Sequence, residues 1–203
     1  MKVVALNLPY KGDRDYLHGT DMYLETIRVL NGDKPEALTG KCRMVIHNIA
    51  RRQCQLLYTF LYDTAKRPEK LIAEFNFISD AGNLIAWLVE TSEDIYDRIP
   101  YAESQITENC IISDRSIKLS CRTRFSAIEE LVAMNKLLHI TKYPPGESRW
   151  YFTRMDLDRL LTVNDVGNLQ VTLQQNLNNR LTLSEVISHD QIIGHIYFSM
   201  VTM

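Results

Sequence analysis

Segments in which apolar and polar residues alternate with a period of two place the strongest constraint on how this chain folds. In residues 41–49 the apolar side chains of Cys42, Met44 and Ile46 alternate with polar ones, and residues 53–62 and 70–77 repeat the pattern. Such alternation is typical of antiparallel strands with one face on a core. Residues 84–89 are apolar on both sides and predict a strand that is buried on both faces.

Two other segments have the 3.6-residue period of amphipathic helices. In residues 22–30 the apolar residues share one face, while Asp21, Glu25 and Arg28 fall on the other. Thr20 is a predicted N-cap, and Asn31-Gly32 a predicted stop. Residues 125–138 form the second predicted helix, whose solvent face contains Glu129, Glu130 and Lys136.

The order of these segments repeats, since each half reads as a strand, a helix and then an antiparallel meander of four strands. The first half begins with a strand at 3–8, and the second with a strand-like stretch at 110–124. The later strands of the second half are expected at 150–157, 169–174, 181–187 and 192–200. The acidic and aromatic residues 92–104 read as the connector. The predicted fold class is α+β, with one domain-like half at 1–100 and another at 101–203.

Charge and composition exclude several classes of protein. The chain has 23 Lys and Arg residues against 25 Asp and Glu, a formal charge of −2, without the basic surplus of a nucleic-acid binder. Its apolar runs are shorter than the roughly 18 residues of a membrane span, and the first ten residues lack the cleavage site of a signal peptide. Four cysteines without a CxxC pair predict reduced core thiols, and the cytoplasm is the expected compartment.

The segment at residues 15–25, DYLHGTDMYLE, resembles a motif of the hot-dog superfamily of acyl-thioester hydrolases and hydroxyacyl-carrier-protein dehydratases. The family pattern has an Asp, a Gly-His pair, asparagines, and then a Tyr and a Glu at the start of the helix. Here His18 precedes Gly19, and the asparagines are missing. With two similarly ordered halves, the resemblance implies a tandem double hot dog. It implies an acyl thioester as ligand, carried by coenzyme A or by an acyl-carrier protein.

The resemblance also suggests a site at the meeting of the two halves. A His before a helix lies near free backbone N–H groups and the positive end of the helix dipole, which can polarise a thioester carbonyl. The implied catalytic residues are His18, Asp21 and, from the other half, Glu129, serving as general acid and base. The implied substrate-binding residues are Tyr23, Asn135, Arg122 and Arg124, the two arginines because guanidinium groups bind phosphate.

Structural explanations exist for the same residues. His18 reads equally as an ordinary capping or loop histidine, and Asp21 as favourable first-turn charge on a helix dipole. Asn135 falls inside the apolar face of its helix, so it either bonds to a neighbouring strand or faces a ligand cavity. The arginine pairs Arg51-Arg52 and Arg122 with Arg124 read either as phosphate contacts or as solvated surface charge.

Two classes of function follow. The first is binding of an acyl thioester with hydrolysis, dehydration or acyl transfer, and the second is a non-catalytic interaction or scaffold module. No nucleophile elbow, phosphate loop or dinucleotide fingerprint is present, and His189 and His195 lack a metal-binding spacing. We therefore expect no metal and no cofactor, no nucleic-acid or membrane partner, and leave a homodimer open.

Overall fold

A computed structural model describes residues 1–60 and 66–202 of the chain, and two compact units divide them. The first unit contains residues from Met1 to Tyr101 together with Asp158–Leu160. The second contains Ala102–Leu157 and the residues from Leu161 onward. Each unit has its own set of antiparallel strands and its own long helix, and each is described by itself.

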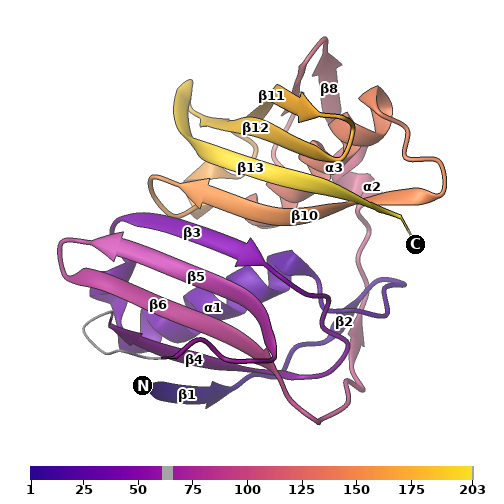
Figure 1. Ribbon diagram of the computed structural model, residues 1–203. Coiled ribbons are helices and arrows are strands. Elements are labelled where there is room, and N and C mark those ends of the chain that lie inside the picture. The colour runs from indigo at the N-terminus through magenta and orange to yellow at the C-terminus, as the bar shows by residue number, and fades with distance from the viewer. Residues whose placement is uncertain (61–65, 203) are drawn as a thin grey trace. The chain divides into compact units, whose positions relative to one another are not determined.

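The first unit places one helix on one face of an antiparallel sheet (Figure 1). Its elements are β1 (Lys2–Ala5), β2 (Tyr10–Lys11), α1 (Gly19–Asp33), a 3-10 turn η1 (Pro35–Leu38), β3 (Lys41–Ile46), β4 (Cys54–Phe60), β5 (Leu71–Ser79), β6 (Gly82–Glu90) and β7 (Arg98–Ile99). The five sheet strands follow the lateral order β1-β4-β6-β5-β3. β2 and β7 form a separate short parallel pair.

The lateral order in the first unit differs from the simple meander that the sequence suggested. β5 and β6 form a tight hairpin, but β4 pairs with β6, as Leu57 opposite Trp87 shows. The strands before and after the connection 61–70, β4 and β5, are therefore not neighbours, because β6 lies between them. Residues 61–65 of this connection, including the last two residues of the predicted strand 53–62, lie outside the described residues.

Both faces of the first sheet are buried around β6, as its apolar sequence predicts. Tyr58 of β4 donates a hydrogen bond from its hydroxyl to Asp33 of α1, which identifies the face that α1 covers. Side chains of the same parity form the core beneath the helix, among them Leu56, Leu84, Ala86 and Leu88. The opposite face holds a smaller apolar cluster of Leu57, Leu71, Trp87 and Val89.

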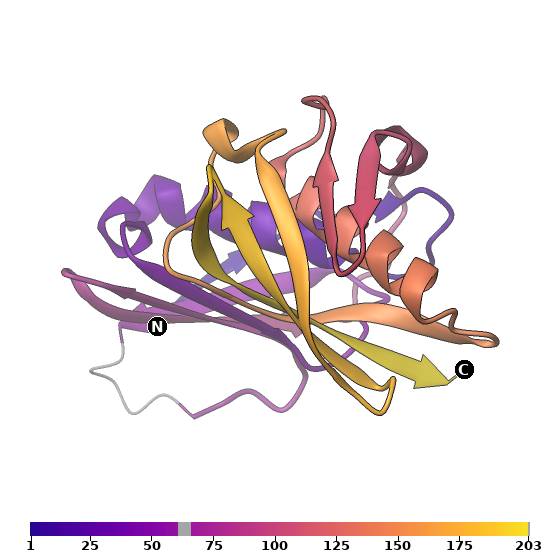
Figure 2. The same ribbon diagram turned by 90° about the horizontal axis from the view of Figure 1, so that it is seen from above.

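The second unit repeats the combination of one long helix and an antiparallel sheet (Figure 2). Its elements are α2 (Ser104–Thr107), β8 (Cys110–Ser113), β9 (Ser116–Leu119), α3 (Ala127–Lys142), β10 (Ser148–Leu157), a 3-10 turn η2 (Val163–Asp165), β11 (Leu169–Leu177), β12 (Leu181–Ser188) and β13 (Gln191–Thr202). The strand order is β10-β13-β12-β11-β9-β8. Here β11, β12 and β13 do form the predicted meander.

Several predicted boundaries change. The expected single strand 110–124 is a hairpin of β8 and β9, because the chain turns at Asp114, which has a positive φ of 31°. Residues 120–126 therefore lie outside any strand. α1 begins earlier than predicted, since the amides of Asp21 and Met22 both donate to the carbonyl of His18. His18, and not Thr20, is the N-cap, and the helix continues through Asn31-Gly32 to Asp33.

The protein is therefore α+β, and each unit packs one long helix against antiparallel strands, as the sequence predicted. The prediction of four core thiols is half right. Cys42 and Cys54 are buried, but Cys110 is only partly buried and Cys121 is exposed at the loop after β9. Burial raises the pKa of the Cys54 thiol to about 12, so this thiol stays protonated at neutral pH.

Across the described ranges 1–60 and 66–202, no helix combines the length and apolar character needed to cross a bilayer.

Candidate functional site

Three of the predicted site residues, His18, Asp21 and Tyr23, lie together at the N-terminal end of α1. The other four, Arg122, Arg124, Glu129 and Asn135, belong to the second unit around α3. The predicted meeting of His18 with Glu129 joins residues of different units and stays a prediction. The first group is the better candidate site, because it contains charged side chains that the fold buries.

A hydrogen-bonded cluster of four polar side chains stands at the start of α1. The Nζ of Lys11 donates to Asp21 Oδ1 at 2.7 Å and to Thr20 Oγ1 at 3.4 Å. The Nδ1 of His18 lies 2.6 Å from the same Thr20 hydroxyl. Thr20 is fully buried, and the exposed fractions are 3% for Lys11 and 9% for both His18 and Asp21.

The parallel strand pair β2–β7 positions Lys11. Register partners are Tyr10 with Arg98 and Lys11 with Ile99. Beyond the strand, the amide of Gly12 donates to the carbonyl of Ile99 at 2.9 Å. This pairing holds the 10–12 segment beside the residues that precede α2, so the Lys11 side chain is directed at the first turn of α1.

Tyr101 covers the cluster from the connector. Its ring centroid lies 5.8 Å from the His18 ring and 4.7 Å from Lys11 Nζ, a distance at which a cation interacts with the face of an aromatic ring. The aromatic ring and the Asp21 carboxylate both compensate the Lys11 charge. Such compensation is required here, because an isolated ammonium buried away from water is costly.

This geometry corrects the prediction for Asp21 and identifies residues that sequence reasoning missed. Asp21 was expected on the solvent face of its helix, but it is buried because Lys11 reaches it from ten residues earlier. Lys11 and Tyr101 gave no signal in the sequence, since lysine is usually exposed and a single Tyr in a connector is common. Tyr23, two residues after Asp21, is 2% exposed and belongs to the core side of α1.

In the second unit, the first turn of α3 corrects the predicted solvent face. Glu129 accepts hydrogen bonds from the amide and hydroxyl of Ser126 at 2.9 and 2.7 Å, which is a capping-box role. Glu130 is fully buried. Its carboxylate accepts from the Thr123 hydroxyl at 2.7 Å and from the Gly167 amide at 2.8 Å, so it joins two loops to the helix.

The two neighbouring glutamates should respond differently to substitution. We expect Glu130→Ala to lower the free energy of unfolding by about 3 kcal/mol, because it leaves several buried donors without a charged acceptor. Glu129→Ala removes only half of a capping box and should cost about 1 kcal/mol. Urea unfolding of both variants measures the difference, and equal losses would contradict the buried role of Glu130.

Arg122 and Arg124 are exposed and follow β9 in the irregular segment 120–126, not at a strand end. The guanidinium of Arg122 donates to the carbonyl of Val163 at 3.4 Å, and that of Arg124 lies 5.4 Å from the Phe125 ring. Their role as phosphate ligands stays a prediction.

Asn135 lies on the inner side of α3. For this residue the sequence left two alternatives, a hydrogen bond to a neighbouring strand or a ligand cavity, and the structure excludes the first. The residue is fully buried, yet neither its Nδ2 nor its Oδ1 has a hydrogen-bond partner in the described part of the chain. The amide therefore does not bond to a neighbouring strand. One turn later, His139 is also buried, with Nδ1 at 2.5 Å from the Asn135 carbonyl and Nε2 at 2.5 Å from Thr182 Oγ1.

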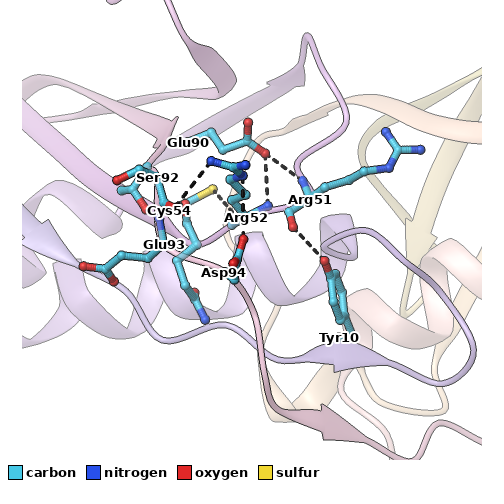
Figure 3. Close-up of polar contacts among 10 residues, drawn as sticks. Tyr10, Arg51, Arg52, Cys54, Glu90, Ser92, Glu93 and Asp94 are labelled. Atoms are coloured by element: carbon cyan, nitrogen blue, oxygen red, sulfur yellow. Dashed lines mark hydrogen bonds and ion pairs between the residues drawn. The ribbon is translucent and has the colours of Figure 1, made fainter.

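The second arginine pair, Arg51-Arg52, is bound by acidic partners. Figure 3 shows both backbone amides donating to Glu90, at 2.7 and 3.1 Å. The Arg52 guanidinium lies 3.8 Å from Asp94. A cleft of about 410 Å³ opens beside this turn, and it is lined by Asn7, Gln53, Ser92, Glu93, Asp94, Tyr96 and Asp97. Its acidic lining disfavours a coenzyme A phosphate here.

No protein-family model matches the sequence, and no curated protein matches it either. Among solved structures, an acyl-ACP thioesterase from Bacteroides thetaiotaomicron aligns with 98% of this chain and 97% of its own, at 6% identity and a TM-score of 0.48. An acyl-CoA thioesterase II from Mycobacterium marinum covers 91% and 89%, at 7% identity and 0.47. A dehydratase domain from Mycobacterium tuberculosis, in complex with C12:1-CoA, covers 92% and 85%, at 8% identity and 0.46. These similarities concern the course of the chain, and few residues are shared.

Proposed function

We propose that this protein binds an acyl thioester, carried by coenzyme A or by an acyl-carrier protein, at the N-terminal end of α1. The observation that supports the proposal is the cluster of Lys11, His18, Thr20 and Asp21. It combines a titratable imidazole with the first amides of a helix, and it buries a compensated cation beside them. Thioesterases and dehydratases appear among the structures of similar chain course, but the argument for this chain comes from its own residues.

In the proposed chemistry, the helix start polarises the substrate and His18 transfers the proton. The first four N–H groups of an α-helix lack intrahelical acceptors, and the positive end of the dipole favours negative charge on a carbonyl oxygen. The Thr20 hydroxyl orients the His18 ring through Nδ1. In hydrolysis, water adds to the carbonyl carbon, the C–S bond breaks, and the proton lost by water reaches the leaving thiolate through the imidazole.

In this proposal the Lys11–Asp21 ion pair holds Thr20, and through it the His18 ring, in position. Because Lys11 already occupies Asp21 Oδ1, Asp21 is better suited to hold Lys11, which in turn contacts Thr20, than to act as the general base that the sequence suggested. Glu129 is likewise held by Ser126. His18 is therefore the catalytic residue of the proposal, and Lys11 and Asp21 are positioning residues.

Binding is tested first with a series of acyl-coenzyme A compounds from acetyl to palmitoyl, using coenzyme A alone as the control. A thioester that binds should raise the melting temperature by an amount that depends on the length of its acyl chain. A ligand present at 100 times its Kd stabilises the native state by about 2.7 kcal/mol. Pantetheine-linked acyl groups separate recognition of the thioester arm from recognition of the nucleotide.

Catalysis is tested by release of the free thiol from the compound that binds. We expect His18→Ala and His18→Asn to lower turnover by about 10²–10⁴-fold. His18→Asn keeps a polar atom near the position of Nδ1, so it should retain the Thr20 contact and the stability. His195→Ala, on β13 of the second unit, is the matched control and should keep full activity. Undiminished turnover in both His18 variants would remove His18 from the chemistry.

Burial of the cluster favours a second candidate, a non-catalytic interaction module. Every residue of the cluster is at most 9% exposed, as expected when buried polar groups only fix the orientation of a helix. This candidate predicts that none of the thioesters changes the melting temperature and that His18→Asn changes neither stability nor any activity. A shift with acyl-coenzyme A and none with coenzyme A excludes it.

A further inference from the structure

Among the described residues of the second unit, two fully buried polar side chains have no hydrogen-bond partner, one on its helix and one on its strand β12. The amide of Asn135 on α3 and the hydroxyl of Ser184 on β12 have no hydrogen-bond partner within residues 1–60 and 66–202. Buried polar groups in native proteins are nearly always paired with protein atoms, water or a ligand. Two such groups in one layer indicate something that complements them both.

The contacts around α3 place these two groups opposite each other. His139 contacts Thr182 at one end of β12. At the other end, Glu130 bonds to Gly167, two residues before Leu169, whose register partner is Ser188. α3 therefore runs antiparallel to β12.

The separation of Asn135 from His139 along α3 then agrees with that of Ser184 from Thr182 along β12. From His139 back to Asn135 is one helical turn, about 6 Å. From Thr182 forward to Ser184 is two strand residues on the same face, about 7 Å. Because the elements are antiparallel, both steps lead in the same direction. Asn135 and Ser184 thus occupy the same level of the helix–sheet layer, and they do not bond to each other.

The residues around Asn135 and Ser184 indicate which kind of ligand could bind between these two side chains. The neighbouring side chains are apolar and buried: Leu131 and Leu138 lie about one helical turn from Asn135 on α3, and Ile196 is the register partner of Ser184. His139, one helical turn from Asn135, is neutral at pH 7, because burial lowers the pKa of its imidazole to about 4. This histidine would therefore not serve as the counter-ion of a charged ligand. The Asn135 amide offers donors and an acceptor, and the Ser184 hydroxyl offers both, which an alcohol group can complement.

We propose that the space between the Asn135 amide and the Ser184 hydroxyl is a binding site for the hydroxyl group of an uncharged, otherwise apolar molecule. The hydroxyl donates to Asn135 Oδ1 and accepts from Asn135 Nδ2 or Ser184 Oγ, while the carbon chain lies among the apolar side chains of α3 and the sheet. This site is independent of the thioester chemistry proposed for α1, because it uses other residues in the other unit.

The test follows the side-chain amide resonances of Asn135 by NMR of the full-length, ¹⁵N-labelled protein. The probes are 1-hexanol, hexyl methyl ether, which cannot donate, and hexanoate, which is charged. We expect saturable shifts with 1-hexanol and at least about tenfold weaker binding of the other two, the cost of one unpaired buried group. Equal binding of all three probes, or no saturable shift with the alcohol, would overturn the proposal in favour of an ordered water only.

Two variants test the same site through stability. Asn135→Leu replaces an unpartnered amide by an apolar side chain of similar size, so it should raise the melting temperature by about 2–4 °C and abolish binding of 1-hexanol. Ser184→Ala should weaken binding without loss of stability. Thr182→Val is the matched control, because Thr182 has a partner in His139 and its loss should lower the melting temperature. A lower melting temperature in Asn135→Leu would show that the amide is satisfied in the folded protein.

Discussion

Lys11→Met is expected to lower the free energy of unfolding by about 3–5 kcal/mol, the range measured when one partner of a buried ion pair is removed. The ammonium and the Asp21 carboxylate are 2.7 Å apart, and their side chains are only 4% and 11% exposed. Without Lys11 the carboxylate stays in a low-dielectric environment and loses its cation. Chemical unfolding followed by circular dichroism measures the loss.

Two further variants give this prediction its controls. Lys11→Met combined with Asp21→Leu removes both charges and should recover most of the stability, because apolar replacement of a buried pair is close to neutral. Lys2→Met removes an exposed partner of Asp33 and should change the unfolding midpoint little, as is usual for surface pairs. If Lys11→Met behaves like Lys2→Met, Lys11 is in contact with water, and the proposed support of His18 is wrong.

Acidification from pH 6.5 to pH 4 should remove about 3 kcal/mol of stability through His139 alone. Burial is the main cause that lowers the pKa of this imidazole from 6.5 to about 4, and the hydrogen bond to the Asn135 carbonyl opposes it. Between these two pH values the unfolded chain binds a proton that the folded chain does not. The stability that the neutral His139 imidazole contributes is therefore complete above pH 6.5. It falls as the pH decreases towards 4, by up to 1.36 kcal/mol for each pH unit.

The control for this prediction is His139→Phe, which keeps an aromatic ring between Trp150 and Phe198 but cannot be protonated. The variant should be less stable at pH 7, because Thr182 loses a partner, yet its stability should change less between pH 6.5 and 4. Asp33, whose carboxyl pKa is lowered mainly by its hydrogen bond to Lys2, stabilises the fold above its ordinary pKa of 3.8 and loses this contribution only as the pH falls below about 4. The same pH slope in the variant and the natural protein would mean that another group titrates.

Local sequence patterns predicted the elements of this fold well. Alternation in residues 41–46, 54–60 and 71–77 gave β3, β4 and β5, because successive side chains of a strand point to opposite faces whatever the strand's neighbours are. The continuous apolar run of β6 predicted its burial on both faces for the same reason. Helical periodicity located α1 and α3, although their ends shifted by several residues.

The candidate site was predicted only in part. His18, Asp21 and Tyr23 were recognised by their place before and within the first turn of a helix, which is local information. Lys11 and Tyr101 were missed, because their relevance depends on the β2–β7 pairing and on the connector. Glu129 and Glu130 look alike in the sequence, and the contacts with Thr123 and the distant Gly167 show which of them is buried.

By itself, then, the sequence determined which segments become strands and helices and which side of each is apolar, since both depend on the geometry of consecutive residues. The tertiary structure decided the order in which strands of the first unit lie side by side, the burial of Lys11, Asp21 and Glu130, and the unpaired amide of Asn135. The physical reason is that a polar group can be buried only where donors or acceptors from far along the chain reach it. Such contacts between residues far apart in the chain cannot be inferred from a local sequence pattern.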